Sequence, residues 1–358
     1  MKDKEFGYAM KALRMVIRRE WHRMTSRRLY LGVCVVLPLL CLFFMATIFG
    51  NGQMENIPVG IVDLDNTATS RNISRRISAA PTFRVTEHFT DEADARRALQ
   101  QKDIYGYLVI PPRFEQKAVT GTGATLTYYY HYALLSVGSE LMAAFENTLA
   151  PVALSPIVMQ AEALGVSGEQ IQTFLLPVEA STHPLYNPDM DYSIYLSQPF
   201  FFVLFQILIL LTTVYSIGSE LKFGSAGEWL EMARGNILTA VAGKLLPYTL
   251  IFSSIGILAN YVLFGPLHIP FAGSLWLMNA VTVLFIIATQ ALAVFIYSVF
   301  PKIAYIISVV SMVGSLGATL SGVTFPVTAM YAPVHAASYL FPVRHFTEAA
   351  QAMIYFDA

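Results

Sequence analysis

Five long apolar runs limit what this 358-residue chain can fold into. They cover Tyr30–Phe49, Pro199–Ile217, Ala240–Phe264, Leu275–Val299 and Ile303–Thr324. A helix needs about 20 apolar residues to cross the hydrocarbon core of a bilayer, and each run is near that length or longer. With 55% hydrophobic and 13% charged residues, the chain is also too apolar for a typical soluble protein. The sequence therefore predicts a polytopic α-helical membrane protein with five spans.

The runs divide the chain into predicted segments. Residues 1–28 are expected to form an interfacial amphipathic helix, and the spans lie at 29–50, 199–218, 239–264, 275–300 and 303–324. An inserted domain occupies 51–198, a charged connection occupies 219–238, and the interrupted tail at 325–358 is expected to be a re-entrant segment. The first 28 residues hold nine basic and three acidic side chains, which places the N-terminus in the cytoplasm. The inserted domain is then extracytoplasmic.

The first segment and the inserted domain have recognisable local patterns. Apolar residues of the first segment recur every three to four positions and predict one apolar helix face, at Met10, Leu13, Val16, Ile17 and Trp21. In the inserted domain we expect strands at 57–62, 83–89, 104–110 and 124–130, with helices at 67–79, after Thr90 as N-cap, and at 134–164. This alternation predicts a small α/β domain. Both cysteines, Cys34 and Cys41, lie in the first apolar run, so this domain contains no disulfide.

The charged connection between the second and third spans must lie at a membrane surface. Glu228 and Glu231 are three residues apart and share a helix face, while Trp229, Met232 and Ala233 form an apolar face. A short amphipathic helix there can offer its charges to a soluble partner. An ordinary solvated hairpin connection explains the same residues, so both interpretations stay open.

Two motifs and the histidines are candidates for chemistry. Asp63-Leu64-Asp65-Asn66-Thr67 resembles the nucleophile loop of haloacid-dehalogenase-type phosphatases, but no later Gly-Asp-x-x-x-Asp cluster accompanies it. A strand end followed by a helix cap explains the same residues. Gly243-Lys244 lacks the other positions of a phosphate-binding loop, so we expect no ATP site in the chain. The seven histidines show no metal-ligand spacing, and the net charge of −1 gives no reason to expect nucleic acid.

The composition of the apolar runs bears on transport. They contain no Asp, Glu or Arg, and Lys244 is their only ionisable cation. Ion-coupled transporters usually need ionisable groups inside the membrane, so any energy for transport is expected to come from elsewhere. The fifth run carries Gly314, Ala318 and Gly322 at a spacing of four, which predicts close packing against another helix. Small residues are also common in spans generally.

Several segments, taken in order, resemble the membrane subunits of ABC-2 type exporters with a large extracytoplasmic domain. The segments are Val59–Asn66 with Ser70, Ala95–Leu99, Tyr105–Glu115, Tyr186–Pro188, Glu220–Ser225, Gly243–Pro247, Leu320–Pro326 and Phe341–Phe346. Glu220–Ser225 is similar to the family's Glu-x-x-x-Gly-Thr coupling motif. The family has six spans, and this sequence ends at Ala358, where the sixth is expected to begin.

The resemblance implies a transmembrane subunit of the bacterial inner membrane that exports its cargo by alternating access. A separate ATP-binding subunit is then expected to bind ATP and Mg²⁺, and a second membrane subunit, identical or paralogous, to complete the pathway. A periplasmic membrane-fusion protein is a further possible partner. The implied coupling residues are Glu220, Lys222, Gly224, Ser225, Glu228, Trp229 and Glu231. Polar residues of the second and fifth spans are expected to line the pathway: Gln206, Thr212, Thr213, Ser216, Ser311 and Ser315.

The lining residues are polar but uncharged, which suits an amphipathic, lipid-like or drug-like cargo. One alternative is a membrane-anchored receptor or scaffold whose outer domain binds a ligand. The other is a phosphatase domain on a membrane anchor.

Overall fold

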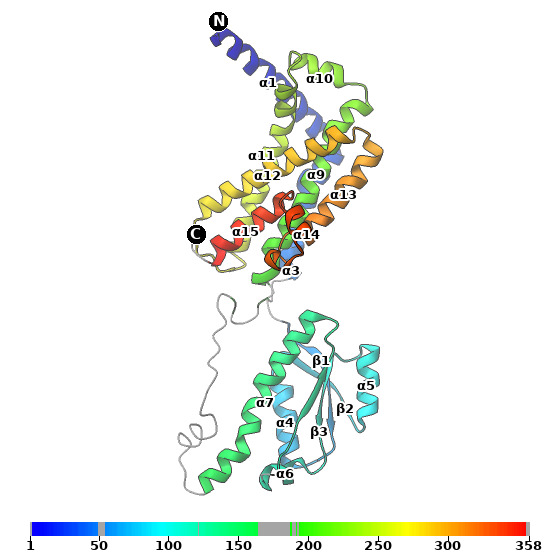
Figure 1. Cartoon of the computed structure of the whole chain (residues 1–358), viewed down its shortest axis with the longest axis vertical. Coiled ribbons are helices and arrows are strands. Elements are labelled where there is room, and N and C mark those ends of the chain that lie inside the picture. The colour runs from blue at the N-terminus through cyan, green and yellow to red at the C-terminus, as the bar shows by residue number, and fades with distance from the viewer. Residues whose placement is uncertain are drawn as a thin grey trace. The chain divides into compact units, whose positions relative to one another are not determined.

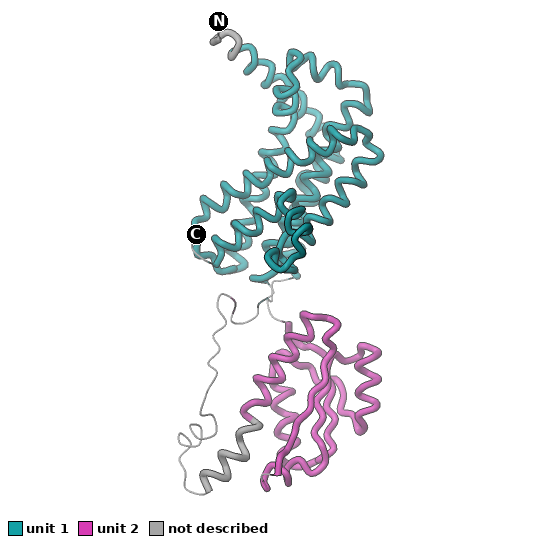
Figure 2. The backbone as a smooth tube through the Cα atoms, viewed as in Figure 1, with its two compact units in different colours: residues 1–52, 191–358 teal, residues 53–190 magenta. Residues whose placement is uncertain are grey.

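The computed structural model describes residues 2–48, 54–120, 122–163, 187, 191 and 193–355. It divides into two compact units (Figure 2), a helical unit made of Met1–Gly52 with Asp191–Ala358, and an α/β unit made of Gln53–Met190. The insertion predicted at 51–198 therefore corresponds to a separate unit with nearby boundaries. The family-like segment Tyr186–Pro188 lies, apart from Asn187, outside the described residues.

The helical unit is built from helices joined by short connections (Figure 1). Its N-terminal part consists of α1 (Lys2–Ser26), α2 (Arg28–Leu31), the π-helical turn η1 (Gly32–Val36) and α3 (Leu37–Ile48). Its C-terminal part consists of η2 (Ser193–Ser197), α9 (Gln198–Lys222), α10 (Ala226–Met232), α11 (Ile237–Phe264), α12 (Leu275–Val299), α13 (Ile303–Thr319), η3 (Val327–Ala329), α14 (Ala332–Ser338) and α15 (Pro342–Tyr355).

In the described part of the chain, four helices are long and apolar enough to cross a membrane. They are Arg28–Ile48, Ser193–Lys222, Ile237–Phe264 and Leu275–Val299. The fifth predicted span, 303–324, extends beyond the end of the helix that the structure contains there. Its helix, α13, has 17 residues and ends at Thr319, which gives a length of about 25 Å at 1.5 Å per residue. The chain then turns, and Gly322 adopts a left-handed φ of 88° that no helix accommodates.

The α9 helix forms the centre of the helical unit. It packs against α12, α13, α3, α11 and α15, and most residues along it are buried. Its apolar side chains surround the whole helix, which is the pattern of a core helix rather than a surface helix. Aromatic rings fill one side of it, with Phe202 lying 4.2 Å from Phe346 and 6.0 Å from Phe285 between ring centroids.

Close contact between α13 and α9 depends on glycine. A Cβ atom on Gly314 would lie 2.6 Å from Cγ1 of Ile207, and one on Gly317 would lie 2.6 Å from Nε2 of Gln206. Ala318 is half-buried against the same core. Gly322, which we predicted to continue this packing face, lies beyond the end of α13 and forms a turn instead. The second close contact with α9 is therefore made by Gly317, which the predicted set of Gly314, Ala318 and Gly322 did not include.

The α/β unit contains a four-stranded sheet with the order β2-β1-β3-β4. Its elements are β1 (Ile57–Asp63), α4 (Ala68–Ala79), β2 (Phe83–Phe89), α5 (Glu92–Gln101), β3 (Gly106–Ile110), α6 (Phe114–Thr120), β4 (Thr127–Tyr130) and α7 (Leu135–Ala163). Both β2 and β3 run parallel to β1, whereas β4 runs antiparallel to β3. The predicted α/β alternation of this unit agrees with these elements, except that α6 was not anticipated.

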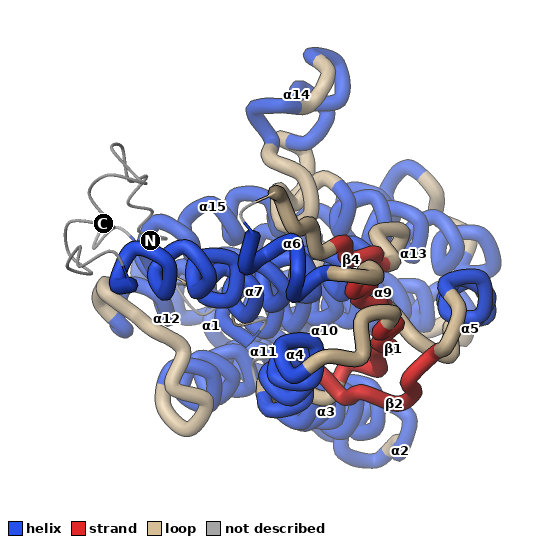
Figure 3. Tube along the Cα trace, turned by 90° about the horizontal axis from the view of Figure 1, so that it is seen from below, coloured by secondary structure: helices blue, strands red, loops and turns tan. Residues whose placement is uncertain are grey.

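Helices cover both faces of this sheet, with α4 and α5 on opposite sides of the strands (Figure 3). On one face, Val59 and Ile61 of β1 pack against Ile73 and Ile77 of α4, and α7 joins the same core. On the other face, Val62 packs with α5. The register of β1 is fixed by this two-sided burial, since a shift by one residue would exchange the two faces.

Side-chain caps begin both crossover helices. Thr67 and Ser70 form a reciprocal capping box at α4, as the predicted helix start at Thr67 requires. At α5 the cap is Asp91, whose carboxylate accepts a hydrogen bond from the backbone N–H of Ala93. The prediction that Thr90 is this cap is therefore wrong by one residue. An ionised Asp91 also interacts favourably with the positive end of the helix dipole.

Candidate functional site

The α1 helix is amphipathic, but its buried face differs from the predicted one. Ala12, Val16, Glu20 and Met24 are all at most 1% exposed and recur every four residues. This face packs against α11, where a Cβ atom on Gly243 would lie only 2.9 Å from Cβ of Val16. Met10 and Trp21, which we assigned to the apolar face, are about half exposed at 50% and 48%. The buried face thus carries a carboxylate.

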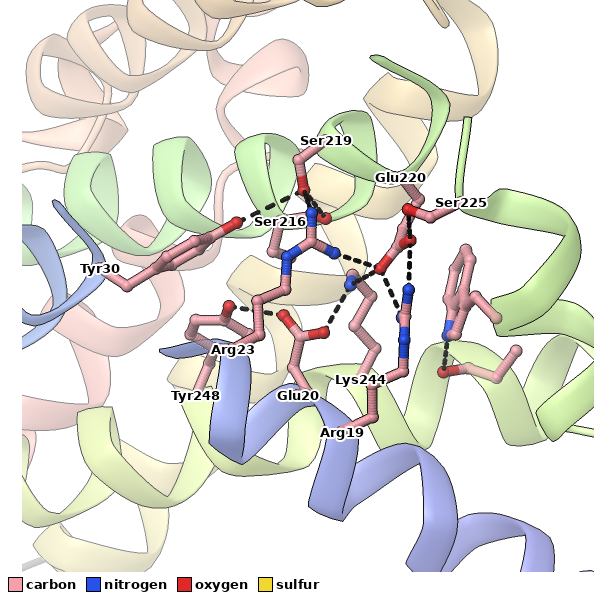
Figure 4. A network of polar contacts seen from close by, with 12 residues as sticks. Arg19, Glu20, Arg23, Tyr30, Ser216, Ser219, Glu220, Ser225, Lys244 and Tyr248 are labelled. Atoms are coloured by element: carbon pink, nitrogen blue, oxygen red, sulfur yellow. Dashed lines mark hydrogen bonds and ion pairs between the residues drawn. The ribbon is translucent and has the colours of Figure 1, made fainter. Parts of the chain in front are cut away.

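Side chains from α1, α9 and α11 converge on Glu220 at the end of α9 (Figure 4). The two guanidinium nitrogens of Arg19 donate to the two carboxylate oxygens of Glu220, at 2.8 and 3.0 Å. Arg23 also donates to Oε1 of Glu220, and its other nitrogen donates to Oγ of Ser219 at 3.0 Å. Such a bidentate pair fixes geometry as well as charge. Glu220 is completely buried.

Lys244 of α11 links this pair to a second carboxylate. Its Nζ lies 2.7 Å from Oε1 of Glu220 and 2.7 Å from Oε2 of Glu20. The other oxygen of Glu20 accepts a hydrogen bond from the hydroxyl of Tyr248 at 2.7 Å. Lys244 and Glu20 are 0% and 1% exposed. We name these five charged residues, Arg19, Glu20, Arg23, Glu220 and Lys244, the ion network.

The electrostatics of the ion network explain why charges can be buried here. Three cations face two carboxylates, so each carboxylate has a compensating charge in direct contact. The hydrogen bond from Arg19 to Glu220 outweighs partial burial and raises the pKa of Arg19 above its ordinary value. A buried charge that loses its partner is strongly destabilising. The three helices are therefore tied together at this point.

The predicted coupling residues fall into two groups. Glu220 and Ser225 are joined, because the Ser225 hydroxyl donates to the Glu220 carboxylate. Between them α9 ends at Lys222, and Gly224 has a left-handed φ of 69°. The predicted connection at 219–238 therefore begins inside α9, turns at Gly224 and continues as the short helix α10 (Ala226–Met232). Lys222 lies exposed at the end of α9.

On α10, the carboxylates and the indole point to different environments. Glu228 and Glu231 are exposed. Trp229 is only 6% exposed, packs with Val16 and Ala240, and its Nε1–H donates to the carbonyl of Ala240 at 3.1 Å. Trp229 therefore anchors α10 to α1 and α11 of its own chain. The resemblance implies that Trp229 contacts a partner, but of these three residues only Glu228 and Glu231 are exposed.

The predicted pathway residues do not form one surface within this chain. Gln206, Thr212, Thr213 and Ser216 are at most 3% exposed inside the helical unit, and Oε1 of Gln206 accepts a hydrogen bond from the backbone N–H of Val343 at 2.9 Å. Thr212 also lines a cavity of about 190 Å³ together with Tyr30 and Cys34. Ser315 is exposed on α13 and Ser311 is half-buried one turn before it.

Most of the ion network was missed at the level of sequence. The motif identifies Glu220, but the sequence shows Arg19, Glu20 and Arg23 only as part of a helix rich in basic residues, and Lys244 only as a cation within an apolar run. One signal was available. Lys244 lies inside an apolar run, and a buried cation requires a carboxylate partner.

The Asp63–Thr67 motif forms a structural turn in the α/β unit. Oδ1 of Asp63 accepts from the backbone N–H groups of Asp65 and Asn66, each at 3.0 Å, and Oδ2 accepts from Oγ of Ser70 at 2.7 Å. Asp65 accepts from the backbone N–H groups of Phe114 and Glu115, at 2.9 and 3.0 Å, where α6 begins. Both carboxylates are therefore engaged within the fold, as a strand end with helix caps requires.

Replacing Asp65 with asparagine is expected to destabilise the α/β unit at neutral pH by about 1 kcal/mol, because charge-assisted hydrogen bonds at the start of α6 are lost. Partial burial acts to raise the pKa of Asp65, but hydrogen bonds from Thr67 and from the backbone of Glu115 and Phe114 lower it below its ordinary value. The stabilisation is therefore fully present above the unfolded-state pKa of about 3.9 and is lost as pH falls through the lowered folded-state pKa.

Thermal unfolding of the purified chain between neutral and acidic pH measures this effect. The gap between wild type and Asp65→Asn should close on acidification. The control is Asp94→Asn, which removes an exposed pair with Arg97 and should change little. Equal stability of wild type and Asp65→Asn at neutral pH would contradict the assignment.

Comparison with known protein families identifies the family of this chain. The family described as ABC-2 family transporter protein matches residues 28–358, which is nearly the whole chain. The chain belongs to the ABC-2 transporter family. Neither the curated proteins nor the solved structures gave a match. As a transmembrane subunit of this ABC-2 family, the chain is a multi-pass membrane protein. Of the ion network, Glu220 and Lys244 lie within the matched region, and the three residues of α1 precede it.

Proposed function

We propose that this chain is the transmembrane subunit of an ATP-driven exporter, and that a separate subunit binds and hydrolyses ATP with Mg²⁺. The observation that carries the proposal is the ion network. It joins the end of α9 to α1 and α11 through buried charges, directly beside the exposed carboxylates of α10. A push on α10 and the end of α9 must therefore move all three helices together, because separating them would uncover unpaired buried charge.

Family membership and the number of long apolar helices favour a transporter over the alternatives. The described residues include four helices that are able to span a membrane, whereas an anchor for a receptor or scaffold needs one. The Asp63 and Asp65 carboxylates, which suggested a phosphatase, are engaged in hydrogen bonds of the fold.

The ATP-binding subunit is proposed to contact α10 through Glu228 and Glu231. Replacing both with alanine is expected to weaken binding by roughly tenfold, since each exposed charge contributes up to about 1 kcal/mol. The measurement is the ATP-hydrolysing activity that co-purifies with the tagged chain from its native membranes. The control is Glu55→Ala with Glu87→Ala, which removes two exposed charges from the α/β unit. Full retention of the activity by the α10 variant would refute this contact.

We further propose that two membrane subunits enclose the pathway, and that the face of α13 with the half-buried Ser311 and the exposed Ser315 contacts cargo. The four lining candidates on α9 are buried within the chain, so they reach the cargo only if α9 and its neighbours move apart. Uncharged hydroxyl groups among apolar side chains suit an amphipathic or lipid-like cargo moved outward by alternating access.

The proposed orientation places the N-terminus and α10 in the cytoplasm and the α/β unit outside it, in a bacterial inner membrane. Single cysteines at Thr122 and Gly227, both exposed positions, are expected to react with an impermeant maleimide from opposite sides of the membrane. Cys34 and Cys41 are first replaced with alanine, so that each variant carries one thiol. Labelling of both positions from the same side would overturn the orientation.

A further inference from the structure

The α/β unit contains an open cleft of about 750 Å³ between α4 and the end of β2. Asp63 at the end of β1 and Phe89 at the end of β2 both line it, so the cleft lies at the carboxyl edge of two parallel strands. Ligands of α/β sheets bind preferentially at this edge. Unlike the ion network, the cleft is reached from solvent.

Basic side chains from two elements line this cleft. Arg71 and Arg75 are one turn apart on α4, and His88 reaches the cleft from β2. Within the described residues neither guanidinium forms an ion pair; Arg71 donates to the carbonyl of Asn66 and Arg75 to the carbonyl of Arg71. The arginines of α5 behave differently, since Arg96 and Arg97 each pair with a carboxylate on their own helix.

A β-bulge aims His88 at this cleft. The pairing of β1 with β2 shifts between Val59 and Gly60, so that Val59 lies opposite Val85 but Gly60 lies opposite Glu87. His88 is then paired with Ile61, whose side chain faces α4. Without the extra residue, alternation along β2 would direct His88 to the other face of the sheet. Bulges that redirect a side chain are common beside functional sites.

One carboxylate, that of Asp63, also lines the cleft, but three hydrogen bonds from the fold occupy it. The wall of the cleft therefore carries two guanidinium groups and one carboxylate that is already hydrogen-bonded. Hydroxyl groups of Ser74, Ser78 and Thr90 also line it. Guanidinium forks match the oxygens of phosphate in pairs.

We propose that this cleft binds a phosphate group through Arg71, Arg75 and His88. The group belongs either to a soluble phosphate ester or to the headgroup of a phospholipid, which share the same chemistry. This proposal concerns the α/β unit alone and does not depend on transport by the helical unit.

The test uses the full-length chain purified in an uncharged detergent without phosphate. Thermal shift and calorimetry are measured with inorganic phosphate, glycerol 3-phosphate, short-chain phosphatidic acid, short-chain phosphatidylcholine and malonate. The double variant Arg71→Gln with Arg75→Gln is expected to weaken phosphate binding by about tenfold or more. The matched control, Arg96→Gln with Arg97→Gln, removes the same charge from α5 and should change binding by less than about twofold.

Two results support the proposal and distinguish the sources. Binding of glycerol 3-phosphate that is lost only in the cleft variant indicates a soluble ester, whereas binding of phosphatidic acid alone, with the same loss, indicates a headgroup. The single variants Arg75→Gln and His88→Gln repeat the test if the double variant does not fold. No binding of any phosphate probe, equal loss in cleft and control variants, or equally tight binding of malonate would overturn it.

Discussion

Replacing Lys244 with methionine is expected to destabilise the helical unit by about 3–5 kcal/mol, because it breaks a buried ion pair from one side. The ammonium group lies 2.7 Å from a carboxylate oxygen of both Glu20 and Glu220. After the change Glu220 still has Arg19 and Arg23, whereas Glu20 keeps, among the described residues, only the hydroxyl of Tyr248 as its donor. The cost therefore falls mainly on Glu20, which is 1% exposed.

The unfolding temperature of the purified chain in detergent measures this effect. The matched control is Lys222→Met, which removes the same charge at the exposed end of α9 and should change stability by less than about 0.5 kcal/mol. Combining Lys244→Met with Glu20→Gln should recover part of the loss, since the second change removes the charge left unpaired. If Lys244→Met is as stable as Lys222→Met, the ion network does not hold the helices together.

The second large effect is expected for Trp229→Ala, which should cost about 3–5 kcal/mol through the cavity it leaves between α10, α1 and α11. It also leaves the carbonyl of Ala240 without the indole donor that lies 3.1 Å away. Trp229→Phe keeps most of the volume and loses only this hydrogen bond, so it should cost about 1 kcal/mol. The exposed Glu231→Ala should leave stability unchanged to within about 0.5 kcal/mol.

Stability and partner binding separate the two roles on α10. Trp229→Ala should lower the unfolding temperature and loosen α10, and so weaken binding of the ATP-binding subunit indirectly. Glu231→Ala should weaken binding of that subunit while the unfolding temperature stays constant. Loss of the ATP-binding subunit in Trp229→Ala at an unchanged unfolding temperature would mean that the indole contacts the partner after all.

Local patterns account for the elements that were predicted well. The strand at Phe83–Phe89 has the predicted bounds, because Pro81 and the cap of α5 end its extended run on both sides. The membrane class follows from hydropathy, which is a property of single segments. One error is of the same local kind. The fifth span was extended to Thr324 since composition alone does not reveal the left-handed turn at Gly322.

By itself, the sequence determined a multi-pass helical protein with an inserted α/β domain, the family that it resembles, and Glu220 as part of a motif. Only the tertiary structure decided what Glu220 does. Its partner Arg19 is 201 residues away, and Glu20 is 224 residues from Lys244. Helix periodicity shows that Glu20 shares a face with Val16, but not which helix covers that face. Whether a charge is exposed or must be paired depends on that covering helix, because burial removes the water that would otherwise solvate the charge.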